Sequence, residues 1–582
     1  MKKFLLFLIL NSQLLVFNSF AQSPNWIWAK SMGGISGDAS YSTAIDASGN
    51  VYSTGYFNGT ADFDPGAGTF YLTTVGSTAI FISKLDPSGN FIWARAMTGT
   101  GYSVGRSIAV DILGNVYTTG YFFGTVDFNP GTGTFNLNTN GSDDIFISKL
   151  DSSGNFVWAK QIAGISDDQG HSISLDSFCN IYTTGSFSFT VDFNPDAGTY
   201  NLTSAGGFDI FISKLDSSGN FVWAKRMGGG SDEQSSSITL DASGSIYTTG
   251  AFLGTADFNP GAGTFYLTPV GVQDIFISKL DSSGNFVWAK AMGGSAGNGT
   301  SIKVGPTGAG DVYTTGAFFG TVDFDPGTGT YNLISTGAAG TYNIFISKLD
   351  SSGNFIWAKA VGGTGSSHGN AIAIDPSGDG GVYTIGYFNG IADFDPGVGV
   401  FNLTGAGGSN DIFISKLDTS GSFVWAKAMG GMATDVGNSI AFDAFGNAHV
   451  AGYFNSHTIT FGSTTLINAD TTGTIPDIFI AKLDTALVTG NNEIENFSNS
   501  ILLFANPISY STTISFSLSQ SQKISLKIFD VNGRLVATVA DKIFTAGANH
   551  CEWNVENINA GFYFLKIESD ELNKSEKIIV TK

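Results

Sequence analysis

A tryptophan followed by alanine and a basic residue recurs along most of this 582-residue chain. The intervals between successive copies are 65 to 69 residues, with the tryptophans at Trp28, Trp93, Trp158, Trp223, Trp288, Trp357 and Trp425. A fixed period of this length indicates a repeat architecture, in which each copy buries its apolar faces against its neighbours. The stretch DIFISKLDSSGNFVWAK even appears verbatim at residues 144–160, 209–225 and 274–290.

Each copy contains four runs rich in β-branched and aromatic residues, bounded by Gly, Asn, Asp and Ser. In one copy these runs are SIAVD (107–111), NVYTTGYF (115–122), DIFISKL (144–150) and NFVWAK (155–160). Short D-x-x-G-N turns join the first run to the second and the third to the fourth, as tight hairpins require. No helical period interrupts them, so the repeat region is predicted to be all-β. Cys179 replaces the turn glycine in DSFCN, which predicts a more strained or differently shaped turn there.

The two ends of the repeat region divide one copy between them. Residue 22 onward begins with a fourth-type run (Asn25 to Lys30), whereas the last copy ends with DIFIAKL at 477–483 and has no fourth run. NFVWAK is apolar on both faces, which favours sheets packed on both sides. We therefore expect a seven-bladed β-propeller over residues 22–484, closed by pairing of the N-terminal strand with the last copy.

The repeats also carry a D-x-x-G-N-x-Y-x-x-G core, as in DASGNVYSTG (46–55) and DASGSIYTTG (241–250). This core resembles the bacterial seven-bladed propeller repeat family over residues 25–484. One copy is degenerate, AFGNAHVAG at 444–452, where His449 takes the tyrosine position. The resemblance implies the fold and says little about activity, because the fold hosts unrelated functions.

The N-terminus reads as an export signal. Lys2 and Lys3 precede an apolar run, and Ser19-Phe20-Ala21 is a small-x-small cleavage site, so residues 1–21 are predicted to be a signal peptide. No later segment is long and apolar enough to predict a transmembrane helix. The two cysteines, Cys179 and Cys551, are too few for a disulfide framework.

Residues 485–500 break the repeat pattern and are predicted to be a linker. Residues 501–582 then alternate apolar and polar positions over several runs, with Asn532-Gly533 as a hairpin turn, which predicts a small β-sandwich. This segment resembles the C-terminal sorting domain of the type IX secretion system, through Asn506-Pro507, IFDVNGR (528–534), NAGFYFLKI (559–567) and KIIVTK (577–582). The resemblance implies secretion to, or display on, the exterior of a Gram-negative bacterium, with the type IX machinery as a partner. An accessory sandwich that binds another molecule is the alternative.

The net charge of −21 excludes one class of partner. Residues 22–484 carry essentially all of this negative charge, which repels phosphate backbones, so no nucleic acid is expected. Cations, neutral sugars and proteins stay open as ligands.

A D-F-D/N-P motif recurs six times between the second and third runs. Oxygen ligands from several copies could hold a hard cation such as Ca²⁺, whereas Asp/Asn-Pro-Gly is also an ordinary turn, the reading that we favour. Half of the copies have Asn at the third position. The candidate metal ligands are the acidic pairs of the other three copies, Asp62, Asp64, Asp323, Asp325, Asp393 and Asp395. No cofactor other than this calcium is expected.

No catalytic residue can be assigned. The histidines, among them His171, His368 and His449, share no metal-ligand spacing, and no nucleophile elbow is present. The acidic residues that depart from the repeat, Asp167-Asp168 and Asp232-Glu233, fall in what we expect to be variable, solvated loops.

The loops between the fourth and first runs vary in sequence and share a face with the long D-F-D/N-P insertions, and function tends to lie on such loops. This long-loop face is the expected location of a glycan or protein ligand. Tyr56, Phe57, Tyr121 and Phe122 lie nearby and could stack on sugars, although packing is the favoured role. The sequence thus favours a non-enzymatic binding or adhesion scaffold. An extracellular enzyme acting on polysaccharide or peptide, and a structural envelope component, are the alternatives.

Overall fold

The computed structural model describes residues 24–305, 310–376 and 380–485, together with 501–504, 511–518, 521–530, 533–545, 547–555, 558–569 and 573–580. The chain divides into two compact units, Met1–Val488 and Thr489–Lys582, hereafter the N-terminal and C-terminal units. The predicted signal peptide (1–21) lies outside the described residues, as does the predicted linker apart from Thr485. Among the described residues no helix has the length and apolar character needed to cross a membrane.

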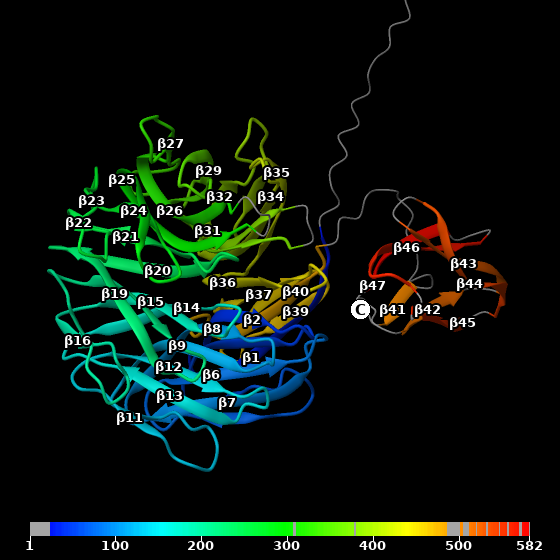
Figure 1. Ribbon diagram of the computed structural model, residues 1–582, viewed down its shortest axis with the longest axis horizontal. Helices are drawn as coiled ribbons and strands as arrows, with labels where there is room; N and C mark the ends of the chain where they lie inside the picture. Colours follow the sequence, from blue (N-terminus) through cyan, green and yellow to red (C-terminus); the bar gives the residue numbers. More distant parts are fainter. Residues whose placement is uncertain are drawn as a thin grey trace, which may run out of the picture. The chain divides into compact units, whose positions relative to one another are not determined.

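The N-terminal unit is built from four-stranded antiparallel sheets that repeat one order of strands (Figure 1). The first strands are β2 (Ala39–Ile45), β8 (Tyr102–Val110), β14 (Asp168–Leu175), β20 (Glu233–Leu240), the second part of β25 (Phe286–Val304), β30 (Ser367–Ile374) and β36 (Asp435–Phe442). The second strands are β3 (Val51–Phe57), β9 (Val116–Phe123), β15 (Ile181–Phe187), β21 (Ile246–Phe252), β26 (Val312–Asp323), β31 (Val382–Asn389) and β37 (Ala448–Phe454). Each sheet is named below after its first strand.

Two further strands complete each sheet. The third strands are β6 (Ala79–Leu85), β12 (Asp144–Leu150), β18 (Asp209–Leu215), β24 (Asp274–Leu280), β28 (Asn343–Leu349), β34 (Asn410–Leu417) and β40 (Asp477–Leu483). The fourth strands are β7 (Phe91–Gly99), β13 (Phe156–Ile162), β19 (Phe221–Gly229), the first part of β25, β29 (Phe355–Gly363), β35 (Phe423–Met429) and, for the β36 sheet, β1 (Trp26–Gly34). Many of the sheets have four to six antiparallel strands, which is consistent with the blades of a propeller.

The first described strand pairs with the last strand of the N-terminal unit. β1 runs antiparallel to β40, with Trp26 opposite Leu483 and Met32 opposite Ile478. The backbone N–H of Asp484 also donates to the carbonyl of Asn25 at 2.9 Å. The predicted pairing between NWIWAK and the final FIAKL segment is therefore present.

The D-F-D/N-P motifs form small hairpins that attach each sheet to the one before it. These hairpins are β4 (Thr60–Asp62) with β5 (Tyr71–Thr73), β10 (Thr125–Asp127) with β11 (Asn136–Asn138), β16 (Thr190–Asp192) with β17 (Asn201–Thr203), β22 (Ala256–Asp257) with β23 (Tyr266–Leu267), the end of β26 with β27 (Asn332–Ile334), and β32 (Ile391–Asp393) with β33 (Asn402–Thr404). The β36 sheet has β38 (Thr458–Phe461) with β39 (Thr464–Ile467) instead. In the β2 sheet, Asp62 lies opposite Gly33 of β1, which belongs to the β36 sheet.

Aromatic residues of the motif fill the space between sheets. Phe63 is fully buried, with its ring 5.4 Å from that of Phe57 and 5.1 Å from that of Phe81. The same trio recurs in the next five sheets. The repeated tryptophan of the fourth strand also connects neighbouring sheets. The indole N–H of Trp93 donates to the carbonyl of Ser152 in the following sheet at 3.3 Å.

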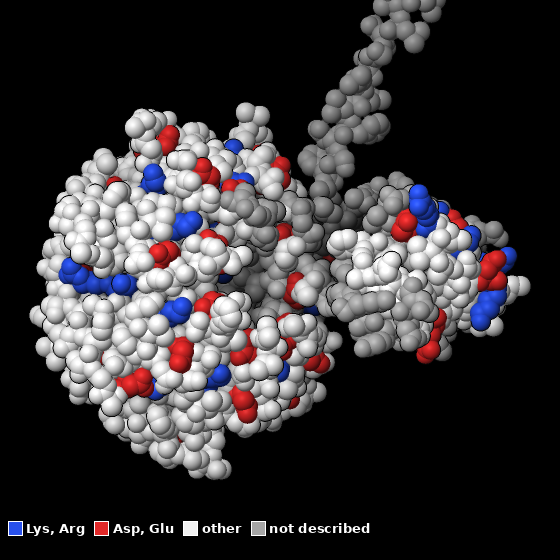
Figure 2. Space-filling view, viewed as in Figure 1, with Lys and Arg blue, Asp and Glu red and all other residues white. Residues whose placement is uncertain are grey.

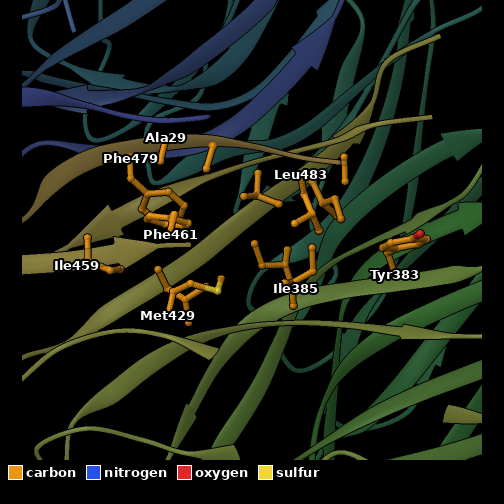
Figure 3. Close-up of a cluster of buried hydrophobic side chains, with 14 of the residues drawn as sticks. Ala29, Tyr383, Ile385, Met429, Ile459, Phe461, Phe479 and Leu483 are labelled. Atoms are coloured by element: carbon orange, nitrogen blue, oxygen red, sulfur yellow. The ribbon is translucent and has the colours of Figure 1, made fainter. Parts of the chain in front are cut away.

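One buried cluster shows how β1 is held (Figure 3). Ala29 of β1 packs with Phe479 and Leu483 of β40 and with Phe461 of β38. Met429, Ile385 and Tyr383 of the β30 sheet complete the same cluster. Burial of apolar side chains from two sheets in one cluster stabilises their contact.

One outward-facing position of the fourth strand is more exposed to solvent than the sequence predicts. Val157 of β13 is 45% exposed, and the equivalent positions Ile27, Ile92, Val222, Val287 and Ile356 are similarly exposed. Burial of both faces of NFVWAK is therefore a wrong prediction at this position, which precedes the part of the fourth strand that pairs with the next hairpin.

The Cys179 turn keeps the shape of its glycine counterparts at the cost of backbone strain. Cys179 adopts φ 59° and its N–H donates to the carbonyl of Asp176 at 2.9 Å, the bond that Gly114 makes to Asp111 at 2.9 Å in the β8 sheet. Phe189, also in the β14 sheet, adopts φ 59° where other sheets have Gly59 or Gly124. The predicted strain is confirmed, whereas the turn is not differently shaped. Cys179 and Cys551 are both unpaired.

The C-terminal unit contains two antiparallel sheets. One consists of β41 (Ile501–Phe504), β42 (Ser511–Leu518) and β45 (Gly547–Asn554), and the other of β44 (Leu535–Phe544), β43 (Gln522–Asp530), β46 (Gly561–Glu568) and β47 (Asn573–Val580). Ile514 and Trp553 of the first sheet share a core with Leu526, Leu565 and Ile578 of the second. Gly533 (φ 76°) turns the chain between β43 and β44, where the Asn532-Gly533 hairpin was expected; Asn532 lies outside the described residues.

Candidate functional site

Every first strand of the N-terminal unit contains a β-bulge at the same place. The pairing register to the second strand shifts between Gly105 and Ser107 in β8, and at the equivalent residues of the other sheets. The extra residue at each bulge is Tyr41, Arg106, His171, Ser236, Thr300, Asn370 or Asn438. The residues on either side of the bulge are almost the same in every sheet, whereas the bulge residue itself differs from sheet to sheet. Bulges re-aim a side chain, and they are frequent beside functional sites.

The bulge residues line a cavity of about 1010 Å³, the first-strand cavity. Its wall consists of residues from all the first strands together with Pro376. Besides the bulge residues, Gln169, Gln234, Asn298 and Lys303 contribute polar side chains. None of the described residues that line it is an aspartate or a glutamate.

Several bulge side chains bind the backbone of the following sheet. Asn370 Nδ2 donates to the carbonyl of Gly437 at 3.0 Å, and Asn438 Nδ2 donates to the carbonyl of Ser40 at 2.9 Å. Thr300 Oγ1 donates to the carbonyl of Gly369, and His171 Nδ1 lies 2.9 Å from the carbonyl oxygen of Ser235. Such bonds fix the wall of the cavity and satisfy carbonyls that the bulges free.

The residue after each bulge makes a second connection between sheets. Ser107 Oγ accepts a hydrogen bond from the N–H of Ile173 at 3.2 Å, and Ser439 Oγ accepts one from the N–H of Thr43 at 3.0 Å. The serines at the equivalent positions of the β2, β14, β20 and β25 sheets accept in the same way from the sheet that follows. The β30 sheet has Ala371 there, which has no hydroxyl group.

Two cations face the cavity. The guanidinium of Arg106 lies over the ring of Tyr41, with its carbon 4.7 Å from the ring centroid, as in a cation–π contact. Lys303 lies on β25, where the equivalent residues of other sheets are small, such as Ala109 and Ser174. Lys303 is solvent-exposed within the cavity, yet desolvation by the surrounding protein lowers the pKa of its ammonium group. Neither cation forms an ion pair with another described residue.

Tyrosines of the second strands lie next to the bulge residues. The ring of Tyr56 is 5.8 Å from that of Tyr41, and burial together with Tyr41, Tyr453, Asp38 and Tyr121 raises the pKa of Tyr56 to about 12. Of the aromatics considered for sugar stacking, Phe57 and Phe122 are fully buried and serve packing. Tyr56 and Tyr121 are half-buried and stay candidates for ligand contact.

Buried carboxyl groups face each other where adjacent sheets meet. Asp38 of the β2 sheet faces Asp477 of the β36 sheet; desolvation, and to a lesser extent Asp477, raises the pKa of Asp38 to about 8. Three junctions repeat this arrangement with the pairs Asp144 and Asp168, Asp209 and Glu233, and Asp411 and Asp435. An oxygen atom of Asp168, Asp209, Glu233, Asp411 and Asp477 lacks a hydrogen-bond partner in the described structure. A proton on one member of each pair removes the repulsion between like charges.

Asp168 and Glu233 are fully buried and begin the first strands β14 and β20. The prediction that Asp167-Asp168 and Asp232-Glu233 lie in solvated loops is therefore wrong for these two residues. Comparison of the first strands with one another would have revealed the error, because Asp38 and Asp435 occupy the same place in other sheets.

The candidate metal ligands lie in separate hairpins. Asp62 Oδ1 accepts from the N–H groups of Asp64 and Phe70 at 3.0 and 2.8 Å, and Asp64 Oδ1 accepts from Gly66 at 2.8 Å. Asp323 with Asp325, and Asp393 with Asp395, repeat these bonds. Within the described chain no three His, Cys, Asp or Glu side chains gather as a metal site.

His171, His368 and His449 take part in hydrogen bonds or ring contacts. His449 is buried, with Nε2 3.2 Å from Asp443 Oδ2, and the ring of His368 stacks on that of Tyr387 at 5.6 Å. Figure 2 shows acidic and basic side chains interspersed on the displayed face of the N-terminal unit. Among the ion pairs of this unit, Lys84 Nζ lies 3.9 Å from Asp46 Oδ2 and Lys482 Nζ lies 2.9 Å from Asp443 Oδ2. The first-strand cavity is thus the candidate functional site of this unit.

Comparison with known proteins agrees with this architecture. Residues 92–121 and 157–186 match the β-propeller repeat family, and residues 502–581 match the secretion system C-terminal sorting domain family. The chain is a β-propeller-repeat protein that carries a secretion system C-terminal sorting domain. A sorting domain of this family implies export through a secretion system, to the exterior or the surface of the cell.

Two curated proteins are similar to parts of the chain. An uncharacterized WD repeat-containing protein of Acanthamoeba polyphaga mimivirus is 25% identical over 455 residues, which cover 64% of this chain and 32% of that protein. The regulatory protein FlaEY of Caulobacter vibrioides is 24% identical over 200 residues, 34% of this chain and 20% of that protein. The chain therefore matches a third or less of the length of either relative.

Proposed function

We propose that the protein is a secreted or cell-surface binding or adhesion scaffold whose N-terminal unit presents a ligand site. The observation that carries this proposal is the variable position at the bulges. A framework repeated almost without change holds side chains as different as Tyr41, Arg106 and Ser236 around one polar cavity of about 1010 Å³. Rigid scaffolds with variable residues at one face are typical of binding proteins.

Residues 22–484 form a closed seven-bladed propeller in this proposal, followed by a linker over 485–500 and the sorting domain over 501–582. The pairing of β1 with β40 supports closure, as does the bond from Asn438 to Ser40. Hydrogen exchange tests it: amides of β1 should be protected as strongly as those of β40. An open arrangement predicts fast exchange along β1, because an unpaired edge strand frays.

A glycan and protein array tests the binding role. The full-length secreted protein should bind one class of ligand without converting it, with the reaction followed by mass spectrometry of the recovered ligand. Recovery of a cleaved product would replace the scaffold role with an extracellular enzyme acting on polysaccharide or peptide. Absence of any specific ligand on a broad array would favour a structural envelope component.

Removal of the sorting domain after export, with release or surface attachment, is the expected fate of residues 501–582. Cell fractionation of the native host tests it. The mature exterior protein should be shorter than the periplasmic form by the mass of this domain, and a chain truncated before residue 501 should accumulate in the periplasm.

A further inference from the structure

The first-strand cavity is positive inside a strongly acidic chain. The chain has 48 Asp and Glu residues against 27 Lys and Arg, a net charge of −21. The described residues that line the cavity nevertheless include Arg106 and Lys303 and no carboxylate. A cleft with low-dielectric walls concentrates the field of the charges inside it. The cavity therefore attracts anions within a chain whose net charge is negative.

The two cations lie at different depths. Arg106 is the bulge residue of β8, whereas Lys303 lies three positions beyond the bulge residue of its own first strand, Thr300. With a rise of about 3.3 Å per residue, three positions correspond to about 10 Å along the strands. The site thus offers two separated positive points, which suit a ligand with more than one anionic group.

Uncharged polar groups line the same cavity. Gln234, Ser236 and Asn298 line the cavity, and their side chains form no hydrogen bond within the described part of the chain. Amide and hydroxyl groups both donate and accept hydrogen bonds, which matches the hydroxyl groups of a sugar. A cavity of about 1010 Å³ has room for several sugar rings, because small-molecule sites occupy about 300–1,000 Å³.

We propose that the first-strand cavity binds an acidic saccharide, a short oligosaccharide that contains uronic acid. Its carboxylates face Arg106 and Lys303, and its hydroxyl groups face Gln234, Ser236 and Asn298. The ring of Tyr41 holds the guanidinium of Arg106 in place for this contact. This inference rests on the proposed binding function and names the chemistry of its ligand.

Titration calorimetry on the full-length protein tests it with three probes: trigalacturonate, its carboxyl-reduced neutral counterpart, and inorganic sulfate. Trigalacturonate should bind at least about ten-fold more tightly than the neutral trimer, because hydrogen bonds to charged groups are stronger than neutral ones. The affinity should fall as salt rises, since ions screen the two cations.

The repeat itself supplies conservative variants. Arg106→Asn copies Asn370 and Asn438 at equivalent bulges, and Lys303→Ser copies Ser174. Each substitution should weaken trigalacturonate binding about ten-fold while the melting temperature stays unchanged. Lys290→Gln removes the same charge from the fourth-strand part of β25, which does not line the cavity, and should leave the affinity unchanged.

The outcomes separate this inference from the binding function itself. Equal affinity for the acidic and neutral trimers, insensitive to both variants, would overturn the anionic chemistry and leave a binding protein. Sulfate that binds as tightly as trigalacturonate would overturn the saccharide. Failure of both anions to bind would overturn the site, whereas a ligand found on the array would still support the scaffold role.

Discussion

The side-chain amide of Asn438 donates a hydrogen bond of 2.9 Å to the carbonyl of Ser40, 398 residues earlier in the chain. Its neighbour Ser439 accepts from the N–H of Thr43 at 3.0 Å. These bonds connect the β36 and β2 sheets in the way that consecutive sheets are connected elsewhere. The same local geometry therefore joins sheets that are adjacent in sequence and sheets that are not.

Removal of the Ser439 hydroxyl should destabilise the N-terminal unit. Ser439→Ala leaves the N–H of Thr43, a buried residue, without its acceptor, and we expect the free energy of unfolding to fall by about 1 kcal/mol. Ala371→Ser is the matched reverse change, since it places a hydroxyl at the one equivalent position that lacks it, and it should stabilise. Chemical denaturation measures both. An equal loss from both substitutions would contradict the role of this hydroxyl.

The junction between Asp38 and Asp477 should make stability depend on pH. The pKa of Asp38 is raised to about 8, well above the value of about 3.9 in an unfolded chain, so the folded state binds more protons between these limits. Stability should then fall as pH rises from about 4 to about 8. Asp477, with a pKa raised to about 7, acts in the same direction.

Asp38→Asn tests this dependence. The amide carries no charge, so the variant should lose less stability between pH 5 and pH 9 than the parent. Its stability should be lower at pH 5, because both Asp38 oxygens accept backbone N–H groups, from Gly34 and Asn58, and the amide nitrogen cannot. Melting temperatures at both pH values give the comparison. Asp64→Asn serves as the control, because Asn129 occupies the equivalent position naturally, and its pH profile should match the parent's.

The two acidic positions of the D-F-D/N-P hairpin should respond differently to substitution. Asp62→Ala removes the acceptor of two backbone N–H groups and should lower the free energy of unfolding by about 1–3 kcal/mol, whereas Asp64→Asn should leave it nearly unchanged.

Thermal unfolding with calcium and then with EDTA checks the alternative role of these aspartates as metal ligands. We expect no shift from either, since these oxygens already accept backbone bonds, and a calcium-dependent rise in melting temperature would support the metal site instead.

Glycine at position 179 should stabilise the β14 sheet. Cys179 holds a positive φ of 59°, which costs an L-residue about 1–2 kcal/mol, and equivalent turns have glycine. We expect Cys179→Gly to raise the free energy of unfolding by about 1 kcal/mol, measured by denaturation under reducing conditions. Cys179→Ala keeps the strain, so a gain from that variant would assign the effect to the thiol.

The strands could be predicted from the sequence because each carries its own signal. NVYTTGYF and DIFISKL became β9 and β12 almost residue for residue, since β-branched residues and glycine turns act locally. The split of one copy between the two chain ends likewise predicts that NWIWAK pairs with FIAKL, and Trp26 lies opposite Leu483. By contrast, the first strand of the β8 sheet begins at Tyr102 and not at Ser107. The bulge at Arg106 interrupts the alternation of apolar and polar residues from which a strand is predicted.

The candidate site was not predictable in the same way. Arg106 and Lys303 are isolated cations in the sequence, and only the packing of separate sheets brings them to one cavity. Asp168 follows a variable loop, which predicts exposure to solvent. It is buried because it faces Asp144 of the preceding sheet. A position that varies while its neighbours repeat is nevertheless visible once the copies are aligned.

The pairing of β1 with β40 also sets the order in which the N-terminal unit can assemble during export. A chain that crosses a membrane from its N-terminus presents β1 first, yet its hydrogen-bonding partner arrives only after almost the whole unit has passed. The β36 sheet can therefore be completed only once residues 477–483 have joined β1, and loss of either end of the unit would leave this sheet without a strand.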